Sequence, residues 1–213
     1  MHLMISIFND NPTLLNILFF YLYPECTRRG DIVFVLDSSG SLEANFELAQ
    51  KLAKRIVHGL NFEGGRTRVG VAVYSSEAHM MFHLNTYNRK EEVLNAITFT
   101  VDGERTNTAA GLEMMRTDMF TPNNGDRTGD PNYAVVITDG RSNMNADITI
   151  DEAIRAHNDD IKVFAVGIGE NGRVDRMEIN GIASDPDNDY AYIMESEDEL
   201  DEVANGILDV ICE

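Results

Sequence analysis

The chain has 213 residues, of which 43% are apolar and 25% are charged. This composition supports one α/β domain with a large core and excludes a predominantly disordered chain. The formal net charge of −19 would repel a phosphate backbone, so we expect no nucleic-acid partner.

Residues 1–25 read as a leader or an irregular N-terminal segment, ahead of a domain that we expect to span residues 26–213. Within the leader, Leu14 to Tyr23 is an apolar run as long as the hydrophobic part of a signal peptide. No Lys or Arg precedes it and no small-x-small cleavage site follows, so it is a poor secretory signal. This run is too short to cross a bilayer and no other stretch is better suited, so we expect no membrane span.

From residue 31 onward, continuous apolar runs alternate with apolar residues at helical spacing. The runs predict buried strands and the spaced patterns predict helices. We expect strands at residues 32–36, 68–74, 78–84, 133–138, 161–166 and 190–194. We expect helices at residues 42–60, 90–98, 109–120, 150–158, 174–183 and 198–211. Only a short link separates the second and third strands, which predicts an antiparallel pair at an edge.

This alternation predicts an α/β fold: a doubly wound, mostly parallel six-stranded sheet with one antiparallel edge strand and helices on both faces. Right-handed crossovers place the carboxyl ends of the parallel strands at one edge, where ligands bind in such folds. Residues directly after the strands are therefore the first candidates for a binding site.

Two aspartates occupy such positions, Asp37 after the first strand and Asp139 after the fourth. A carboxylate at the end of an apolar strand needs solvent, a partner or a metal, and two at one edge suggest a hard cation. The spacing Asp37-x-Ser39-x-Ser41 strengthens this interpretation, because Gly40 permits a tight turn that points alternate oxygens to one place. Hydroxyl ligands add no negative charge, so the cation would still attract an external carboxylate.

A third segment, Glu104-Arg105-Thr106-Asn107-Thr108, precedes a predicted helix. A polar side chain there can cap the helix by accepting from its free amides, or it can offer an oxygen to the metal. We assign the cap to Asn107 or Thr108 and the metal contact to Thr106.

The two cysteines, Cys26 and Cys212, bracket the predicted domain. A disulfide would tie the two ends of the domain together, since domain termini often lie close, and would require an oxidising compartment. Two free thiols are the alternative, and the residues alone leave both open.

Three segments give the chain a resemblance to the von Willebrand factor A domain, also called the integrin I-type domain. They are Asp37-Ser38-Ser39-Gly40-Ser41 after an apolar strand, Thr106-Asn107-Thr108, and Thr138-Asp139-Gly140. The resemblance covers roughly Cys26 to Cys212. Asp139-Gly140-Arg141-Ser142 and Arg68-Val69-Gly70-Val71 further resemble the extracellular-matrix branch of the family, as in matrilins and the A domains of collagens.

The resemblance implies a metal-ion-dependent adhesion site. Ser39, Ser41 and Thr106 would contact the metal directly, and Asp37 and Asp139 would contact it directly or through water. The implied cofactor is Mg²⁺, with Mn²⁺ or Ca²⁺ as alternatives, and the open position would take a Glu or Asp of a protein ligand. The implied function is extracellular adhesion without catalysis, with collagen or another matrix protein as the partner and assembly with other matrix subunits as a further role.

In the matrix branch the flanking cysteines commonly pair, so the resemblance favours a Cys26–Cys212 disulfide and a secreted protein. The final helix of family members can shift when the ligand shell of the metal changes, and a disulfide just beyond that helix predicts a muted shift here. The chain departs from the usual arrangement in its leader and in lacking a second domain. This departure points to a piece of a longer protein or to a mispredicted product.

Two other functions stay open. A metal-assisted hydrolase or phosphotransferase would use the same aspartates to hold Mg²⁺, but no His, Lys or Cys accompanies either motif as a base or nucleophile. The other alternative is a structural module for matrix assembly. Its metal site would be idle, meaning that the site would take no part in its function.

Three weaker patterns have simpler explanations. The acidic cluster at residues 195–202 is typical of a solvated helix face, with a patch for basic partners or Ca²⁺ as the alternative. Arg29-Gly30-Asp31 spells a cell-attachment tripeptide, but its aspartate abuts a buried strand. The segment 167–172 matches a dinucleotide fingerprint, but it comes too late in the fold to open a nucleotide-binding unit.

Overall fold

A computed structural model describes residues 26–101, 105–139, 141–169 and 174–213. The described residues form a six-stranded sheet with the order β3-β2-β1-β4-β5-β6. Every neighbouring pair is parallel except β2 and β3, which are antiparallel. The strands are β1 (Gly30–Asp37), β2 (Thr67–Tyr74), β3 (Ala78–Phe82), β4 (Asn132–Thr138), β5 (Ile161–Ile168) and β6 (Ala191–Met194). The predicted fold class, including the antiparallel edge strand, is confirmed.

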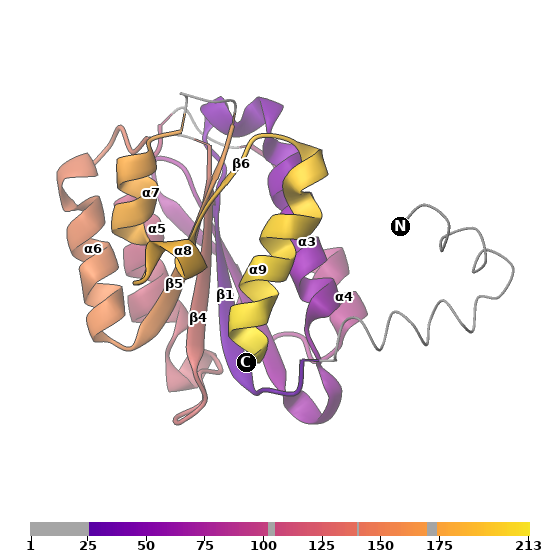
Figure 1. The fold of residues 1–213 in the computed structure, drawn as a ribbon. Helices are drawn as coiled ribbons and strands as arrows, with labels where there is room; N and C mark the ends of the chain where they lie inside the picture. Colours follow the sequence, from indigo (N-terminus) through magenta and orange to yellow (C-terminus); the bar gives the residue numbers. More distant parts are fainter. Residues whose placement is uncertain (1–25, 102–104, 140, 170–173) are drawn as a thin grey trace, which may run out of the picture.

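Helices cover both faces of this sheet (Figure 1). On one face lie α5 (Thr108–Met114), α6 (Ala146–Asn158) and α7 (Arg176–Ile182), and on the other α3 (Phe46–Gly59), α4 (Lys90–Ala96) and α9 (Leu200–Cys212). A short helix, α8 (Asp187–Tyr190), precedes β6. The strand β1 lies between the two helical layers with all eight of its residues buried, which explains its unbroken apolar sequence.

Several element boundaries differ from the sequence prediction. Helix α6 begins at Ala146, four residues before the predicted start, because its first turn is largely polar and carries no apolar period. The predicted helix at 109–120 is regular only to Met114 and continues as a π-helical turn over Met115–Met119. Strand β3 ends at Phe82, after a register shift opposite Val71 and Ala72. These differences fall where the local pattern is weakest, at the ends of elements.

The two ends of the described domain are joined by a disulfide between Cys26 and Cys212, whose Cα atoms lie 4.9 Å apart. The pairing implied by the family resemblance is therefore present. The disulfide fixes the C-terminal end of α9 near the start of β1, so the first strand and the last helix are held together.

Part of the acidic cluster pairs with helix α3. Lys51 contacts Glu197 at 2.8 Å and Arg55 contacts Asp201 at 2.6 Å. Ion pairs between exposed side chains add little to stability, so these two mainly hold residues 197 and 201 against α3. Among the described residues, no helix combines the length and apolar character needed to cross a membrane.

Candidate metal centre

The carboxylate of Asp37 lies at the end of β1 and is fully buried. One of its oxygens accepts from the backbone N–H of Ser39 at 2.8 Å, and the other accepts from the hydroxyl of Thr138 at 2.7 Å. Thr138 ends the neighbouring strand β4, so this carboxylate joins the two strand ends. Both of its oxygens are thereby fixed in orientation.

A chain of oxygens continues from this point toward the surface. The hydroxyls of Ser39 and Ser41 lie 3.0 Å apart, and Ser41 donates to the Oδ1 atom of Asp139 at 3.0 Å. Ser39 is 1% exposed and Asp139 is 9% exposed, whereas Ser41 is open to solvent. These oxygens therefore extend from the buried carboxylate of Asp37 to the solvent-exposed hydroxyl of Ser41.

Backbone contacts bring Thr106 to the same edge of the sheet. Its carbonyl accepts from the N–H groups of Asn143 and Met144, at 3.0 and 3.2 Å, and its own N–H donates to the side chain of Asn143 at 3.0 Å. The next residue, Asn107, donates its N–H to the carbonyl of Ser75, just after β2. The Thr106 segment thus lies between the loops that follow β2 and β4.

The helix after this segment begins as the sequence indicated. Asn107 is the cap residue of α5, and its side chain accepts from the N–H of Ala110 at 3.3 Å. Gly111 lets the helix lie directly on the sheet, because a Cβ atom there would fall 2.8 Å from the Tyr74 ring and 3.0 Å from Val35. This close approach fixes how near the start of α5, and the Thr106 segment before it, lie to the sheet.

The donor set fits a hard divalent cation. Burial raises the pKa of Asp37, and the hydrogen bonds from Ser39 and Thr138 only partly oppose that shift. No Lys, Arg or His of the described chain forms a salt bridge with Asp37. A buried carboxylate of this kind is stabilised by a cation, and the two carboxylates and three hydroxyls are oxygen ligands of the type that Mg²⁺ and Ca²⁺ take.

Within the described residues, no three His, Cys, Asp or Glu side chains form a cluster that could hold a metal. The predicted ligand set differs from such a cluster, because three of its five residues are hydroxyl side chains. The five predicted residues instead come from three loops at one sheet edge, after β1, before α5 and after β4.

Behind these residues lies a set of buried polar side chains that the sequence reasoning did not assign to the site. Ser142 contacts Thr108 and Glu178, and Thr108 contacts the hydroxyl of Tyr74. Ser142 stands in a segment that carries the family resemblance, so a signal for it existed. Glu178 belongs to no sequence motif, because its position depends on how helix α7 packs.

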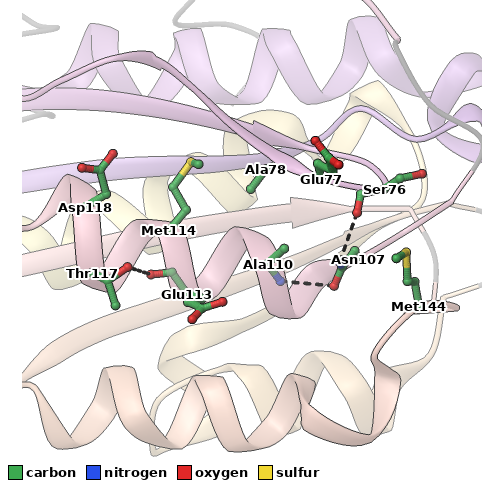
Figure 2. Close-up of a pocket in the computed structure, with 10 residues that line it drawn as sticks. All are labelled: Ser76, Glu77, Ala78, Asn107, Ala110, Glu113, Met114, Thr117, Asp118 and Met144. Carbon is green, nitrogen blue, oxygen red and sulfur yellow. Dashed lines mark hydrogen bonds between the residues drawn. The ribbon is translucent and has the colours of Figure 1, made fainter.

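A shallow groove adjoins the Thr106 segment, with a volume of about 540 Å³ (Figure 2). Asn107 and Met144 lie at the end next to the candidate centre, and Ala78, Ala110 and Met114 supply apolar surface. Its other lining side chains are polar or acidic: Ser76, Glu77, Glu113, Thr117 and Asp118. The predicted metal ligands are not part of its lining, so the groove lies beside the centre.

The cell-attachment tripeptide has a structural role at the opposite edge. Asp31 is fully buried and accepts two hydrogen bonds from Arg127, at 2.8 Å from its backbone N–H and 2.9 Å from its Nε. It is therefore inaccessible to a receptor, as expected from its sequence context. The second half of the glycine pattern at 167–172 lies outside the described residues.

Comparison with known proteins identifies the relatives of this fold. Residues 31–206 match the family model of the von Willebrand factor type A domain. Matrilin-1 of Gallus gallus is 32% identical over 192 residues, which cover 87% of this chain and 38% of matrilin-1. The collagen alpha-1(XII) chain of Notophthalmus viridescens is 29% identical over 192 residues, covering 88% of this chain and 20% of the collagen chain. The chain thus spans well under half the length of these relatives.

Solved structures of proximal thread matrix protein 1 from the mussel byssus have the same fold. One superposes with a TM-score of 0.80 at 25% identity, covering 88% of this chain and 49% of that chain. Another, described as having a zinc-occupied MIDAS motif, gives a TM-score of 0.78 at 25% identity, covering 94% and 51%.

Proposed function

Because the chain belongs to the von Willebrand factor type A domain family, we propose that it is an extracellular protein-binding module with a metal-ion-dependent adhesion site. Asp37, Ser39, Ser41, Thr106 and Asp139 would hold a divalent cation, Mg²⁺ in the first place and Mn²⁺ or Ca²⁺ as alternatives. The cation would supply a Lewis-acidic position for the carboxylate of a partner's Glu or Asp.

One observation carries this proposal: the hydrogen bond between Ser41 and Asp139, which joins two of the three loops above the buried Asp37. Three of the five ligands are neutral hydroxyls, so the cation would keep most of its charge for an outside ligand. The exposed position of Ser41 gives that ligand access. The zinc-occupied motif of the byssus protein supports divalent metal binding in this fold.

The relatives suggest which class of protein binds this domain. A matrilin, a collagen chain and a thread matrix protein all share this domain, which supports collagen or another matrix protein as the ligand and the extracellular matrix as the location. Assembly with other matrix subunits would place the same domain in a scaffold.

A non-catalytic role is supported by the surroundings of the serines. In the described chain, the Ser39 and Ser41 hydroxyls hydrogen-bond to each other and to Asp139, and no His or Lys contacts them as a general base. A serine nucleophile requires such a base.

The test is binding of immobilised collagen and of a matrix extract, in buffer with Mg²⁺ or with EDTA. We expect EDTA, Asp37→Ala and Asp139→Ala each to abolish binding, while Asp209→Ala, the same change at an exposed site on α9, leaves it unchanged. Binding that ignores EDTA and both variants would favour an assembly module with an idle site. Metal-dependent turnover of esters or phosphoesters, lost in the same variants, would favour a hydrolase.

A further inference from the structure

Helix α7 holds the loop that follows Asp139 at two successive residues. Arg141 pairs with Asp175, the cap residue of α7, at 3.3 Å. The carboxylate of Glu178 accepts from the backbone N–H of Ser142 at 3.0 Å and from its hydroxyl at 2.5 Å. Ser142 is three positions beyond Asp139, so α7 contacts the chain shortly after that residue.

The carboxylate of Glu178 directs its hydrogen bonds to Ser142. It is half-buried, and it forms no salt bridge within the described residues, since the nearby Arg141 pairs with Asp175 instead. Ser142 is 3% exposed and also touches Thr108 at 2.8 Å and Thr149 at 3.2 Å, both of them fully buried. A carboxylate that accepts from both the backbone and the side chain of one buried residue fixes that residue in position and rotation.

The Thr108 hydroxyl that Ser142 contacts also contacts the hydroxyl of Tyr74, at 3.4 Å. Ser142 therefore joins Glu178 on α7 to buried side chains of α5 and β2.

We propose that Glu178 is a positioning residue for the metal centre: from helix α7 it holds Ser142, and through Ser142 it fixes the loop that presents Asp139. This inference rests on the proposed metal-binding function. It assigns α7, which contributes no ligand, a direct mechanical connection to the site.

The test titrates Mn²⁺ alone into the purified chain by calorimetry. Loss of a partner behind a metal ligand typically weakens binding 10- to 100-fold, so we expect Glu178→Gln to raise the Kd for Mn²⁺ about tenfold. Glu178→Ala should weaken it further, because glutamine still offers an oxygen to the Ser142 N–H. The matched control is Asp187→Asn, which removes a carboxylate that accepts from Asn180 on α7 at 2.8 Å but touches no part of the loop.

One further measurement separates positioning from general stability. In EDTA, amide hydrogen exchange at Ser142 should accelerate in Glu178→Ala and stay unchanged in Asp187→Asn.

The outcomes are distinguishable. A wild-type chain that binds no Mn²⁺ overturns the proposed function and this inference with it. Wild-type binding with an unchanged Kd in Glu178→Gln and Glu178→Ala overturns the inference alone, even if the variants unfold at a lower temperature in EDTA.

Discussion

Ser41 donates a hydrogen bond to Asp139 across 3.0 Å, although 98 positions separate them in the sequence. The contact exists because β1 and β4 are adjacent parallel strands that end at the same edge of the sheet. Each residue follows the end of its strand, so the distance between the two oxygens depends on the sheet register and on the turn after Asp37.

A double-mutant cycle tests this pair. If Ser41 and Asp139 share one cation, Ser41→Ala and Asp139→Asn should each weaken Mn²⁺ binding, with an interaction energy of about 0.5–3 kcal/mol between them. Calorimetric titration of Mn²⁺ into the wild type, both single variants and the double variant measures this energy. Strictly additive effects would place the two side chains in separate sites.

Replacing Gly111 by a larger residue should destabilise the fold. A Cβ atom there meets the ring of Tyr74 at 2.8 Å, and that ring is fully buried. Overpacking costs about 1–3 kcal/mol and the better helix propensity of alanine returns about 1 kcal/mol, so Gly111→Ala should destabilise the fold by up to about 2 kcal/mol. Urea unfolding in EDTA measures the loss, with Glu113→Ala on the exposed side of α5 as a control. A variant as stable as the wild type would show that α5 can move away from the sheet.

Tyr74 should make stability depend on pH in the alkaline range. Burial, reinforced by the charge of Asp37, raises the pKa of its phenol well above 10.0. The folded state then keeps a proton that the unfolded chain releases, so the free energy of unfolding falls as the pH rises above about 10. The difference between wild type and Tyr74→Phe in urea unfolding isolates this slope, because the other titrating groups cancel. A difference that stays constant from pH 9 to 11, the range around the tyrosine value, would contradict the assignment.

Arg127 should be a major stabilising residue at the edge opposite the metal centre. It is 12% exposed and pairs with the fully buried Asp31. Removing one partner of such a pair leaves an uncompensated charge, so we expect Arg127→Met to cost about 3–5 kcal/mol. Adding Asp31→Asn should recover a large part of this loss, which denaturant unfolding of both variants would reveal. A loss below about 1 kcal/mol in Arg127→Met would match an exposed ion pair instead.

The disulfide should contribute mainly to stability. Cys26 and Cys212 are 186 positions apart, and closing so long a loop stabilises the fold by about 5 kcal/mol in the chain-entropy model. The Cys26→Ser/Cys212→Ser variant should lose this amount in urea unfolding, and the reduced wild type should match it.

Removing the disulfide should also release α9. Because the bond fixes the end of that helix near β1, we expect the ligand affinity of the double variant to change relative to the oxidised wild type. An unchanged affinity would mean that the disulfide does not restrain a shift of α9.

The sequence by itself determined the fold class and the kinds of residue at the site. The apolar run before Asp37 and the run before Thr138 predicted two buried strands, because a strand covered on both faces must be apolar throughout. Residues after such strands meet at one edge. Local patterns therefore predicted Asp37, Ser39, Ser41, Thr106 and Asp139 as candidate ligands, and Asn107 as a helix cap.

Only the tertiary structure decided what stands behind those residues. Glu178 contacts Ser142 from a helix that follows a different strand, and no spacing in the sequence relates the two. Tyr74, Thr108 and Ser142 meet in the core because Gly111 lets α5 lie directly on the sheet. A short-range pattern records the conformation of one segment, whereas these contacts depend on the packing of several segments at once. The sequence could therefore predict the candidate oxygen ligands, and the packing of α5 and α7 decides what lies behind them.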